Sequence, residues 1–436
     1  MQHDGSGASA THTVFVPAPP YLRSRTRPRL LDRHLLALLI IMSLALAVVP
    51  EVITHLNVKH SPDLPPLEDD SASSKFPLAH LASLGGSALL LALSSFVVLM
   101  KRGHPNRNIG GVLILLLAVN IPYVLSPALP AVADLPKIAL ANLFVLALWK
   151  TGASIDELKW VPIIVAGIGV YSLIGGLIIP DYMMYNIVSE KAIIGGWELA
   201  GPFGHGNVLG MYCAVAFSLV PLIPGRRWQV VCGMILFTTA LASASRTAVI
   251  ASVLVALWWL ICRFRSVISI RFVGTVFVSA GVSAMLVLPF LNWDPHAFTD
   301  RASVWAASLG VWQHSPLVGL GVNWFLTDAK YSANVAVWAY VGTGHNLVVD
   351  TLVKSGVIGV VILAPVLVTA IVAARALRLT NQQIALFGYL GAFFVAAATE
   401  AVWALLPNLQ LFPISGLIFA MLILSRHGDR AEEGLL

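Results

Sequence analysis

Two arginines and one histidine stand out because side chains of these types could hold and transfer a group that leaves as an anion. Arg246 lies in S-A-S-R-T, Arg301 in D-R-A-S-V-W, and His345 in G-T-G-H-N. A guanidinium stays charged and matches pairs of phosphate oxygens, so two arginines suit a diphosphate. A histidine beside a helix start favours the neutral imidazole, which can accept a proton. The pattern predicts a diphosphate site formed by Arg246 and Arg301, with His345 as base.

Arg246 and His345 also have purely structural interpretations. Arg246 could extend its side chain toward lipid headgroups, and His345 could cap a helix or lie in a loop. Asn346 follows His345 and is itself a good helix cap. The local sequence therefore leaves a functional and a structural role open for both residues.

Three further residues are possible accessories to the site. His205 lies among glycines in G-P-F-G-H-G-N-V-L-G. Asp350 lies four residues before Lys354, a spacing that favours a neutralising ion pair on one helix over a separate function for the lysine. Glu400 lies near the end of an apolar run and could act as a base or orient one.

Several other chemistries find no support. The sequence has no G-x-x-x-x-G-K-[ST] phosphate loop, no H-E-x-x-H and no G-x-S-x-G. Cys213, Cys232 and Cys262 lie inside or at the ends of apolar runs, which argues against a disulfide framework or a paired-cysteine zinc site. We expect no cofactor and no metal.

The elements that must position these residues are apolar helices. Hydrophobic residues make up 58% of the 436 residues and charged residues only 11%, against roughly 25% charged in a soluble chain. Apolar runs near the 20 residues that cross a bilayer predict an all-α, polytopic membrane protein with about 12 transmembrane helices. The predicted spans are 34–52, 78–100, 109–125, 133–149, 160–179, 206–223, 228–243, 247–262, 272–291, 345–373, 382–400 and 409–425.

The distribution of positive charge predicts the orientation. If the spans alternate, the 27 lysines and arginines divide into 19 on the side of the N-terminus and 8 on the other. The positive-inside rule then places both ends in the cytoplasm. We expect a basic, disordered cytoplasmic tail at 1–33, a transmembrane catalytic domain at 34–425 and a second cytoplasmic tail at 426–436. The basic clusters are topological and do not indicate nucleic-acid binding.

The longest outer segment, residues 292–344 between the ninth and tenth helices, contains a periodic stretch. Ala302, Trp305, Leu309 and Trp312 recur near helical spacing, which predicts an interfacial amphipathic helix that starts at Arg301. The stretch from Pro316 to Gly321 is expected to end this helix. Long loops in compact proteins are usually functional or disordered.

These motifs together resemble the bacterial O-antigen ligase and polymerase superfamily, with the exopolysaccharide-polymerase branch as the best fit. The resemblance is carried by G-P-F-G-H-G-N-V-L-G, by S-x-S-R-T, and by D-R-A-S-V-W through P-L-V-G-L-G-V-N-W-F to G-H-N-L-V-V-D-T-L-V-K-S-G. It covers residues 200–375. Lys354 departs from the family pattern, in which an acidic residue commonly precedes the following glycine, so the role of this position stays open.

The resemblance implies a metal-independent, inverting glycosyltransferase at the outer face of the bacterial cytoplasmic membrane. Its donor would be a glycan on a polyprenyl diphosphate such as undecaprenyl diphosphate, and its acceptor a second glycan or a lipid. Arg246 and Arg301 would hold the diphosphate, and His345 would activate the acceptor hydroxyl. A chain-length regulator is a possible partner.

Three functions remain open at this stage. A polymerase of lipid-linked repeat units is favoured, and a ligase that transfers the glycan to a lipid or envelope acceptor is the first alternative. A transporter or flippase is the second, motivated by the many spans and the intramembrane Asp350 and Lys354. The lack of a visible internal repeat weakens this last alternative. An inorganic-ion permease is disfavoured because a small ion does not need a long tryptophan-rich loop.

Overall fold

A computed structural model describes residues 30–59, 76–101, 108–127, 134–186, 196–327, 342–403 and 410–425. The predicted tail at 1–33 lies outside these residues up to position 29, as do residues 328–341 of the outer loop and the tail at 426–436. Helix α1 (Leu30–His55) already begins within the last four positions of the predicted tail. Asp32 in its first turn forms an ion pair with Lys101.

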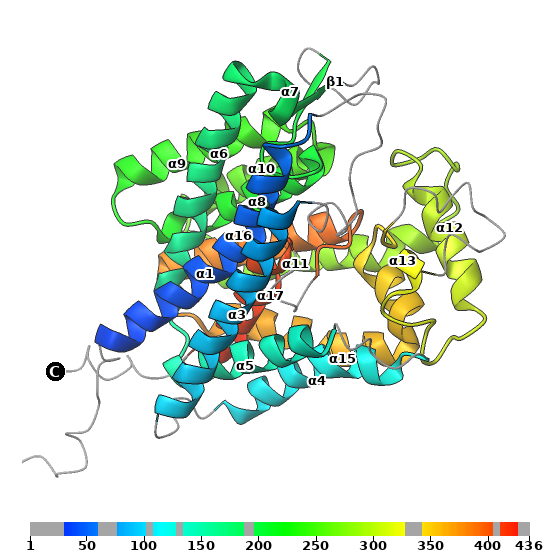
Figure 1. The fold of residues 1–436 in the computed structure, drawn as a ribbon. Coiled ribbons are helices and arrows are strands. Elements are labelled where there is room, and N and C mark those ends of the chain that lie inside the picture. Colours follow the sequence, from blue (N-terminus) through cyan, green and yellow to red (C-terminus); the bar gives the residue numbers. More distant parts are fainter. Residues whose placement is uncertain are drawn as a thin grey trace, which may run out of the picture.

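The protein is an all-α membrane protein (Figure 1), and each predicted span overlaps a helix. The elements after α1 are α3 (Pro77–Met100), α4 (Ile109–Leu125), α5 (Leu135–Thr151), η3 (Ile155–Lys159), α6 (Trp160–Ile178), α7 (Pro180–Met183), β1 (Met184–Asn186), β2 (Trp197–Leu199), α8 (Gly206–Leu219), η4 (Val220–Leu222), α9 (Arg226–Ala242), α10 (Arg246–Cys262), α11 (Ile270–Val287), η5 (Leu288–Phe290), α12 (Arg301–Trp312), α13 (Trp324–Thr327), α15 (Leu347–Ala376), α16 (Thr380–Ala397), η7 (Phe412–Ile414) and α17 (Gly416–Leu424).

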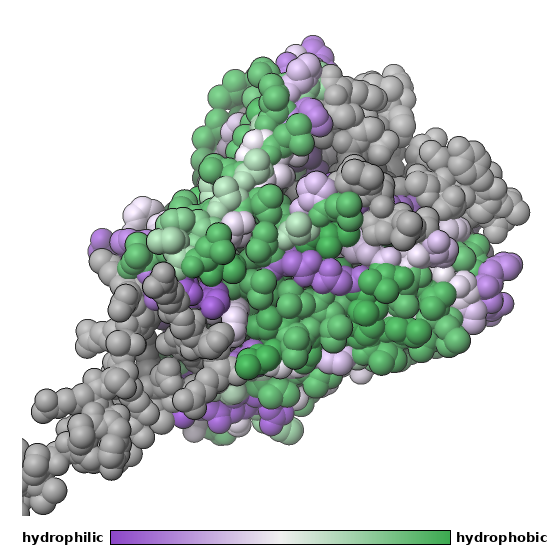
Figure 2. Space-filling model, turned by 60° about the horizontal axis from the view of Figure 1, so that its bottom comes forward, coloured by the Kyte–Doolittle hydropathy of each residue, from purple (hydrophilic) through white to green (hydrophobic). Residues whose placement is uncertain are grey.

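Length and hydropathy separate these helices into two groups. Among the described residues, 5 segments are long and apolar enough to cross a membrane: 31–55, 77–100, 155–178, 270–290 and 347–376. Other apolar helices, such as α4 and α10, are shorter. Figure 2 shows a broad hydrophobic surface on one face of the molecule, crossed by a narrow band of hydrophilic residues, with further hydrophilic residues near its margins. A total of about 12 crossings stays a prediction.

Helices α8 and α16 form the centre of the molecule. All but two residues of α8 and most residues of α16 are buried, including Tyr212, Phe387, Tyr389 and Phe393. A helix that is apolar on every side is stable when other helices surround it. Helix α16 packs against α8, α10, α11 and α15, so the end of α16 lies where several helix ends can contribute side chains.

Helix α15 is broken at Gly356, whose backbone is left-handed at φ 63°. The segment 316–321 fills the break: the Leu320 N–H donates to Val353 O at 2.7 Å, and the Val357 N–H donates to Pro316 O at 2.9 Å. A Cβ at Gly319 would lie 2.5 Å from the Ser355 nitrogen. Broken helices persist in membranes where protein groups satisfy the freed backbone. Helix α12 ends at Trp312, before the P-L-V-G-L-G motif begins, and the motif stabilises α15.

Helix α12 begins at Arg301, as the periodicity predicts, and lies with α13 at one end of the molecule (Figure 1). Trp305 is 1% exposed and its indole N–H donates to the His345 carbonyl at 3.2 Å. The sequence suggested a tryptophan anchored at a lipid interface. In the structure Trp305 instead lies inside the protein and joins α12 to the segment before α15.

Candidate functional site

Arg301, His345 and Glu400 meet at one point although they come from three distant segments. A terminal nitrogen of Arg301 (Nη2) donates to Glu400 Oε1, and His345 Nδ1 lies 3.2 Å from Glu400 Oε2. The side chains are 17%, 23% and 13% exposed, respectively. One carboxylate therefore bridges the predicted base and one of the two predicted diphosphate ligands.

The charge state of Glu400 fixes the histidine tautomer. Burial alone would raise the pKa of this carboxyl, but Arg301 and the hydrogen bond from His345 outweigh burial and hold the pKa below its ordinary value. An ionised carboxylate only accepts hydrogen bonds, so His345 Nδ1 must be the donor. In the neutral ring Nε2 is then the atom with a free lone pair, the state a general base requires.

Asn346 holds His345 in place through its own side chain. It is fully buried, and its oxygen accepts from the Val348 and Val349 N–H groups at 2.8 and 3.1 Å. Its amide donates to Met285 O and Ala398 O, both at 3.0 Å. The predicted cap is present, and the same side chain also joins the start of α15 to α11 and to the segment just before Glu400.

Residues with a left-handed backbone conformation lie at or close to the candidate residues in the sequence. The non-glycine residues with positive φ in the described segments are Ala244, Phe298, Thr299, Asp300 and His345. Three of them directly precede Arg301, one precedes Arg246 by two positions, and the last is His345 itself at φ 47°. Such conformations cost roughly 1–3 kcal/mol each and persist where surrounding contacts enforce them. The packing thus holds His345, and the segments that lead to Arg246 and Arg301, in unfavourable but defined backbone conformations.

Arg301 is held on two sides. Its Nη1 donates to the Phe298 carbonyl at 3.3 Å, and its Nη2 is engaged by Glu400. Its Nε is buried and has no hydrogen-bond partner among the described residues. The guanidinium is therefore already positioned, while one buried donor remains available for a ligand.

Arg246 is the exposed first residue of α10, and Ser245 caps this helix by accepting from the Ala248 N–H at 3.4 Å. The next residue, Thr247, lies within hydrogen-bond distance of Thr399, at 3.1 Å between hydroxyl oxygens. Thr399 precedes Glu400 in sequence. The structure thus places the start of α10 beside the carboxylate that Arg301 and His345 share.

Two of the sequence motifs pack directly against each other. A Cβ at Gly206 would lie 2.4 Å from Ser243 O, and one at Gly210 would lie 2.5 Å from Ser243 Oγ. Glycine at these positions allows α8 to approach the S-A-S-R-T segment closely. The first motif therefore supports the position of Arg246.

His205 caps α8 and has a carboxylate neighbour. Its Nδ1 accepts from the Asn207 N–H at 3.0 Å and lies 3.0 Å from Glu198 Oε1. Glu198 is 5% exposed and also accepts from the Gly206 N–H at 2.6 Å. His205 also contributes to the lowered pKa of Glu400, after the larger effects of Arg301 and His345. His205 thus lies close to the cluster.

Sequence reasoning missed Glu198. This residue lies on β2, which pairs antiparallel with β1 so that Tyr185 faces Glu198 in the register. The only signal in the sequence was its position seven residues before His205. Nothing in the local pattern showed that the β1–β2 pair brings Glu198 back to the start of α8.

Asp350 and Lys354 form the ion pair that their spacing predicts, at 2.9 Å. The other oxygen of Asp350 accepts from the Gly344 N–H at 3.0 Å. Asp350 therefore braces the glycine that precedes His345. Lys354 also lies 5.7 Å from the centre of the Phe325 ring.

The site is built from cationic, imidazole and carboxylate groups. Across the described ranges, no three His, Cys, Asp or Glu side chains are placed to hold a metal ion. The cysteines Cys213, Cys232 and Cys262 are buried and free.

A comparison with protein families finds one match, and a search of curated proteins finds none. Residues 231–364 match the family model described as O-antigen ligase. This segment contains Arg246, Arg301 and His345, whereas Glu400 and His205 lie outside it. Residues 231–364 are therefore similar to the O-antigen ligase and polymerase superfamily.

Proposed function

We propose that this protein polymerises polyprenyl-diphosphate-linked oligosaccharide repeat units at the outer face of the bacterial cytoplasmic membrane. The superfamily acts on lipid-linked glycans, which supports glycosyl transfer in a membrane. The observation that carries the proposal is the contact of Glu400 with both Arg301 and His345.

The proposed base is His345 Nε2. It takes the proton of the acceptor hydroxyl while the hydroxyl oxygen forms a bond to the anomeric carbon of the donor. The bond between that carbon and the diphosphate oxygen breaks, and its electrons leave with the diphosphate. A single displacement inverts the anomeric configuration. Glu400 orients the ring and stabilises the imidazolium that forms, as a carboxylate does in other base–orienter pairs.

The proposed leaving-group site uses both arginines. Arg246 lies exposed at the start of α10, where Thr247 contacts Thr399, and Arg301 is partly buried with its Nε unpartnered among the described residues. Positive groups fixed before the reaction stabilise charge as it develops, without reorganisation. Arg301 has a second role through Glu400, because it lowers the carboxyl pKa and so keeps the orienting group ionised.

Transfer by the purified protein tests the enzymatic proposal directly. The protein in detergent, supplied with a lipid-linked repeat unit and no gradient, should produce longer lipid-linked glycans. A transporter or flippase would leave the glycans unchanged under these conditions. Failure of the wild-type chain to elongate any lipid-linked glycan would contradict the proposal.

A ligase is the second candidate, because the matched family carries that description. Both reactions use the same donor chemistry, so the acceptor decides between them. Deleting the gene and sizing the glycans on the lipid carrier separates the two. Single repeat units should accumulate if the protein is a polymerase, whereas long chains retained on the carrier would show a ligase.

The proposed orientation places both termini in the cytoplasm and the cluster outside. Its support is the uneven distribution of positive charge described above. Cysteines at Ala306, exposed on α12, and at Val267, 86% exposed between α10 and α11, can report the two faces. An impermeant thiol reagent on intact cells should label A306C and spare V267C. The reverse pattern would overturn the orientation.

A further inference from the structure

Two further arginines lie at the opposite ends of helices that begin beside the candidate site. Helices α8 and α10 begin beside the cluster, at Gly206 and Arg246. With 14 and 17 residues they extend about 21 and 26 Å from it. At their other ends a hollow of about 380 Å³ opens between η4, α9 and α10. It is therefore on the opposite side of the helix bundle from His345.

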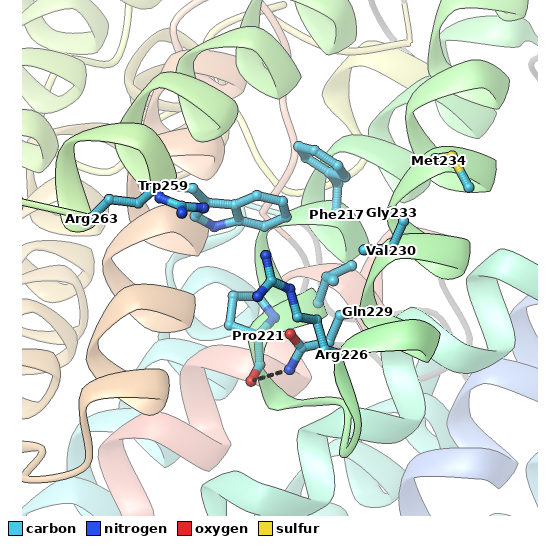
Figure 3. A pocket seen from close by; sticks show the side chains of 10 residues that line it. Phe217, Pro221, Arg226, Gln229, Val230, Gly233, Met234, Trp259 and Arg263 are labelled. Atoms are coloured by element: carbon cyan, nitrogen blue, oxygen red, sulfur yellow. Dashed lines mark hydrogen bonds between the residues drawn. The ribbon is translucent and has the colours of Figure 1, made fainter.

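Two arginines converge on this hollow. Figure 3 shows Arg226, from the start of α9, and Arg263, from the end of α10, both directed toward the Trp259 ring. In the part of the chain that the structure describes, neither side chain forms a hydrogen bond or an ion pair. Two like charges brought to one place without an acidic partner favour an anion between them.

The surrounding sequence supplies no carboxylate. Residues 199–293 contain six arginines and no aspartate or glutamate. The acidic residues of η3, which packs against η4, have other partners: Asp156 accepts from Gln382 at 2.7 Å, and Glu157 lies 3.3 Å from Lys159. The counter-charge for Arg226 and Arg263 is thus not provided by these neighbours.

Trp259 gives a second, independent indication of a ligand. Its ring lines the hollow and is fixed by Phe217, with ring centres 4.5 Å apart. Its indole nitrogen is buried and has no hydrogen-bond partner among the described residues. A buried donor without a partner costs roughly 1–3 kcal/mol, which donation to an acceptor on a bound ligand would relieve.

The rest of the lining is apolar and continues onto exposed hydrophobic surface. Val230 and Met234 line the hollow and are 52% and 58% exposed. Leu260, one turn before Arg263, is 55% exposed. Such a surface on a membrane protein faces acyl chains. The Gln229 amide is engaged by the Ile223 carbonyl at 2.8 Å, so it closes the loop rather than adding a polar wall.

We propose that this hollow binds an anionic phospholipid in the leaflet opposite the candidate active site. Arg226 and Arg263 hold the phosphate, the Trp259 N–H donates to one of its oxygens, and an acyl chain lies along Val230 and Met234. Basic pockets between helices at a membrane surface bind anionic headgroups in this way. The proposal does not depend on the glycosyl-transfer chemistry.

Native mass spectrometry of the full-length protein tests whether it binds an anionic phospholipid. Phosphatidylglycerol and phosphatidylcholine of the same chain length are titrated into the detergent-purified protein. The wild-type chain should retain phosphatidylglycerol at about 10-fold lower concentration, since each surface arginine adds on the order of a few-fold in affinity. Equal retention of the two lipids would overturn the proposal. So would displacement of phosphatidylglycerol by inorganic phosphate, which would show an ion site instead.

Variants locate the site. R226Q, R263Q and the double variant should lose the preference, and W259F should weaken it less. R265Q is the matched control, because Arg265 is exposed just beyond α10 but does not line the hollow. Loss of the preference in R265Q to the same extent would show a general surface charge and exclude the hollow. If the double variant does not fold, the two single variants give the same comparison.

Discussion

The two arginine clusters lie at opposite ends of the same helices and differ in their counter-charge. Arg301 is 17% exposed and paired with Glu400, which also holds His345. Arg226 and Arg263 line a hollow without an ion pair among the described residues. An arginine with a carboxylate partner can position and tune other groups. Arginines that converge without one are suited to receive an anion from outside the protein.

The backbone differs between the two ends as well. Around the Glu400 cluster, residues with side chains adopt left-handed conformations, among them Asp300 and His345. At the hollow the left-handed position is Gly225, at φ 85°, where glycine adopts it without strain. Strain is thus retained where reacting groups must be aligned and is absent where a mobile lipid is expected to bind.

The largest expected effect is at His345. H345N should reduce glycosyl transfer by about 10²–10⁴-fold, because the variant loses the proposed base. Asparagine tolerates left-handed backbone, so its thermal unfolding should stay close to wild type. H345A should be equally inactive but less stable, because alanine does not tolerate φ 47° as well. Near-wild-type turnover in H345N would exclude His345 as the base and direct attention to His205.

Removing the charge of Glu400 tests the bridge itself. E400Q should lower turnover by about 10²-fold or more, since the neutral amide no longer fixes the donor state of His345 Nδ1 and leaves Arg301 without its partner. E157Q is the matched control, because Glu157 is also a buried, ion-paired carboxylate but belongs to η3, outside the candidate site. Its turnover should fall much less. Equal losses in the two variants would show that any buried ion pair matters, and the comparison of the two clusters would fail.

The same carboxyl predicts a pH dependence of stability. The folded protein holds the pKa of Glu400 below its ordinary value of 4.5, since Arg301 and His345 outweigh burial. The resulting stabilisation is fully present above that ordinary value and is lost as the pH falls through the lowered value. Unfolding temperatures of the wild type should therefore fall more steeply below about pH 4.5 than those of E400Q. Parallel curves would show that folding does not lower the pKa of Glu400.

Lysine substitutions distinguish the two site arginines. R301K should lower kcat by about 10- to 100-fold, because a lysine cannot bind Phe298 O and Glu400 through two nitrogens in the same geometry and one charged hydrogen bond is lost. R246K should act mainly on the KM for the donor and by a smaller factor, since Arg246 is exposed. Steady-state kinetics with varied donor measures both. A larger kcat effect in R246K would reverse the proposed roles.

The smallest expected effect on transfer comes from the packing behind the site. G206A should destabilise the fold by about 1–3 kcal/mol, because its Cβ would lie 2.4 Å from Ser243 O. G167A is the control, since a Cβ at Gly167 meets no atom within 4 Å. It should be neutral or slightly stabilising. A fully stable G206A would show that the approach of the two motifs is loose.

The sequence alone determined the local structure of this protein. Hydropathy located the helices, the spacing of Trp305 and Trp312 placed α12 from Arg301, and Asn346 was identifiable as a cap. The four-residue spacing of Asp350 and Lys354 indicated their ion pair. These features depend on interactions within a few residues, which helix geometry makes predictable.

The tertiary structure decided which side chains act together. Glu400 was one of several accessory candidates, and only the packing of α16 brings it to Arg301, 99 residues away, and to His345, 55 residues away. The pairing of Glu198 with His205, the break in α15 and the hollow at Arg226 have the same origin. Contacts at such separations depend on how helices pack, and the hydropathy of a helix shows that it is buried without showing against what.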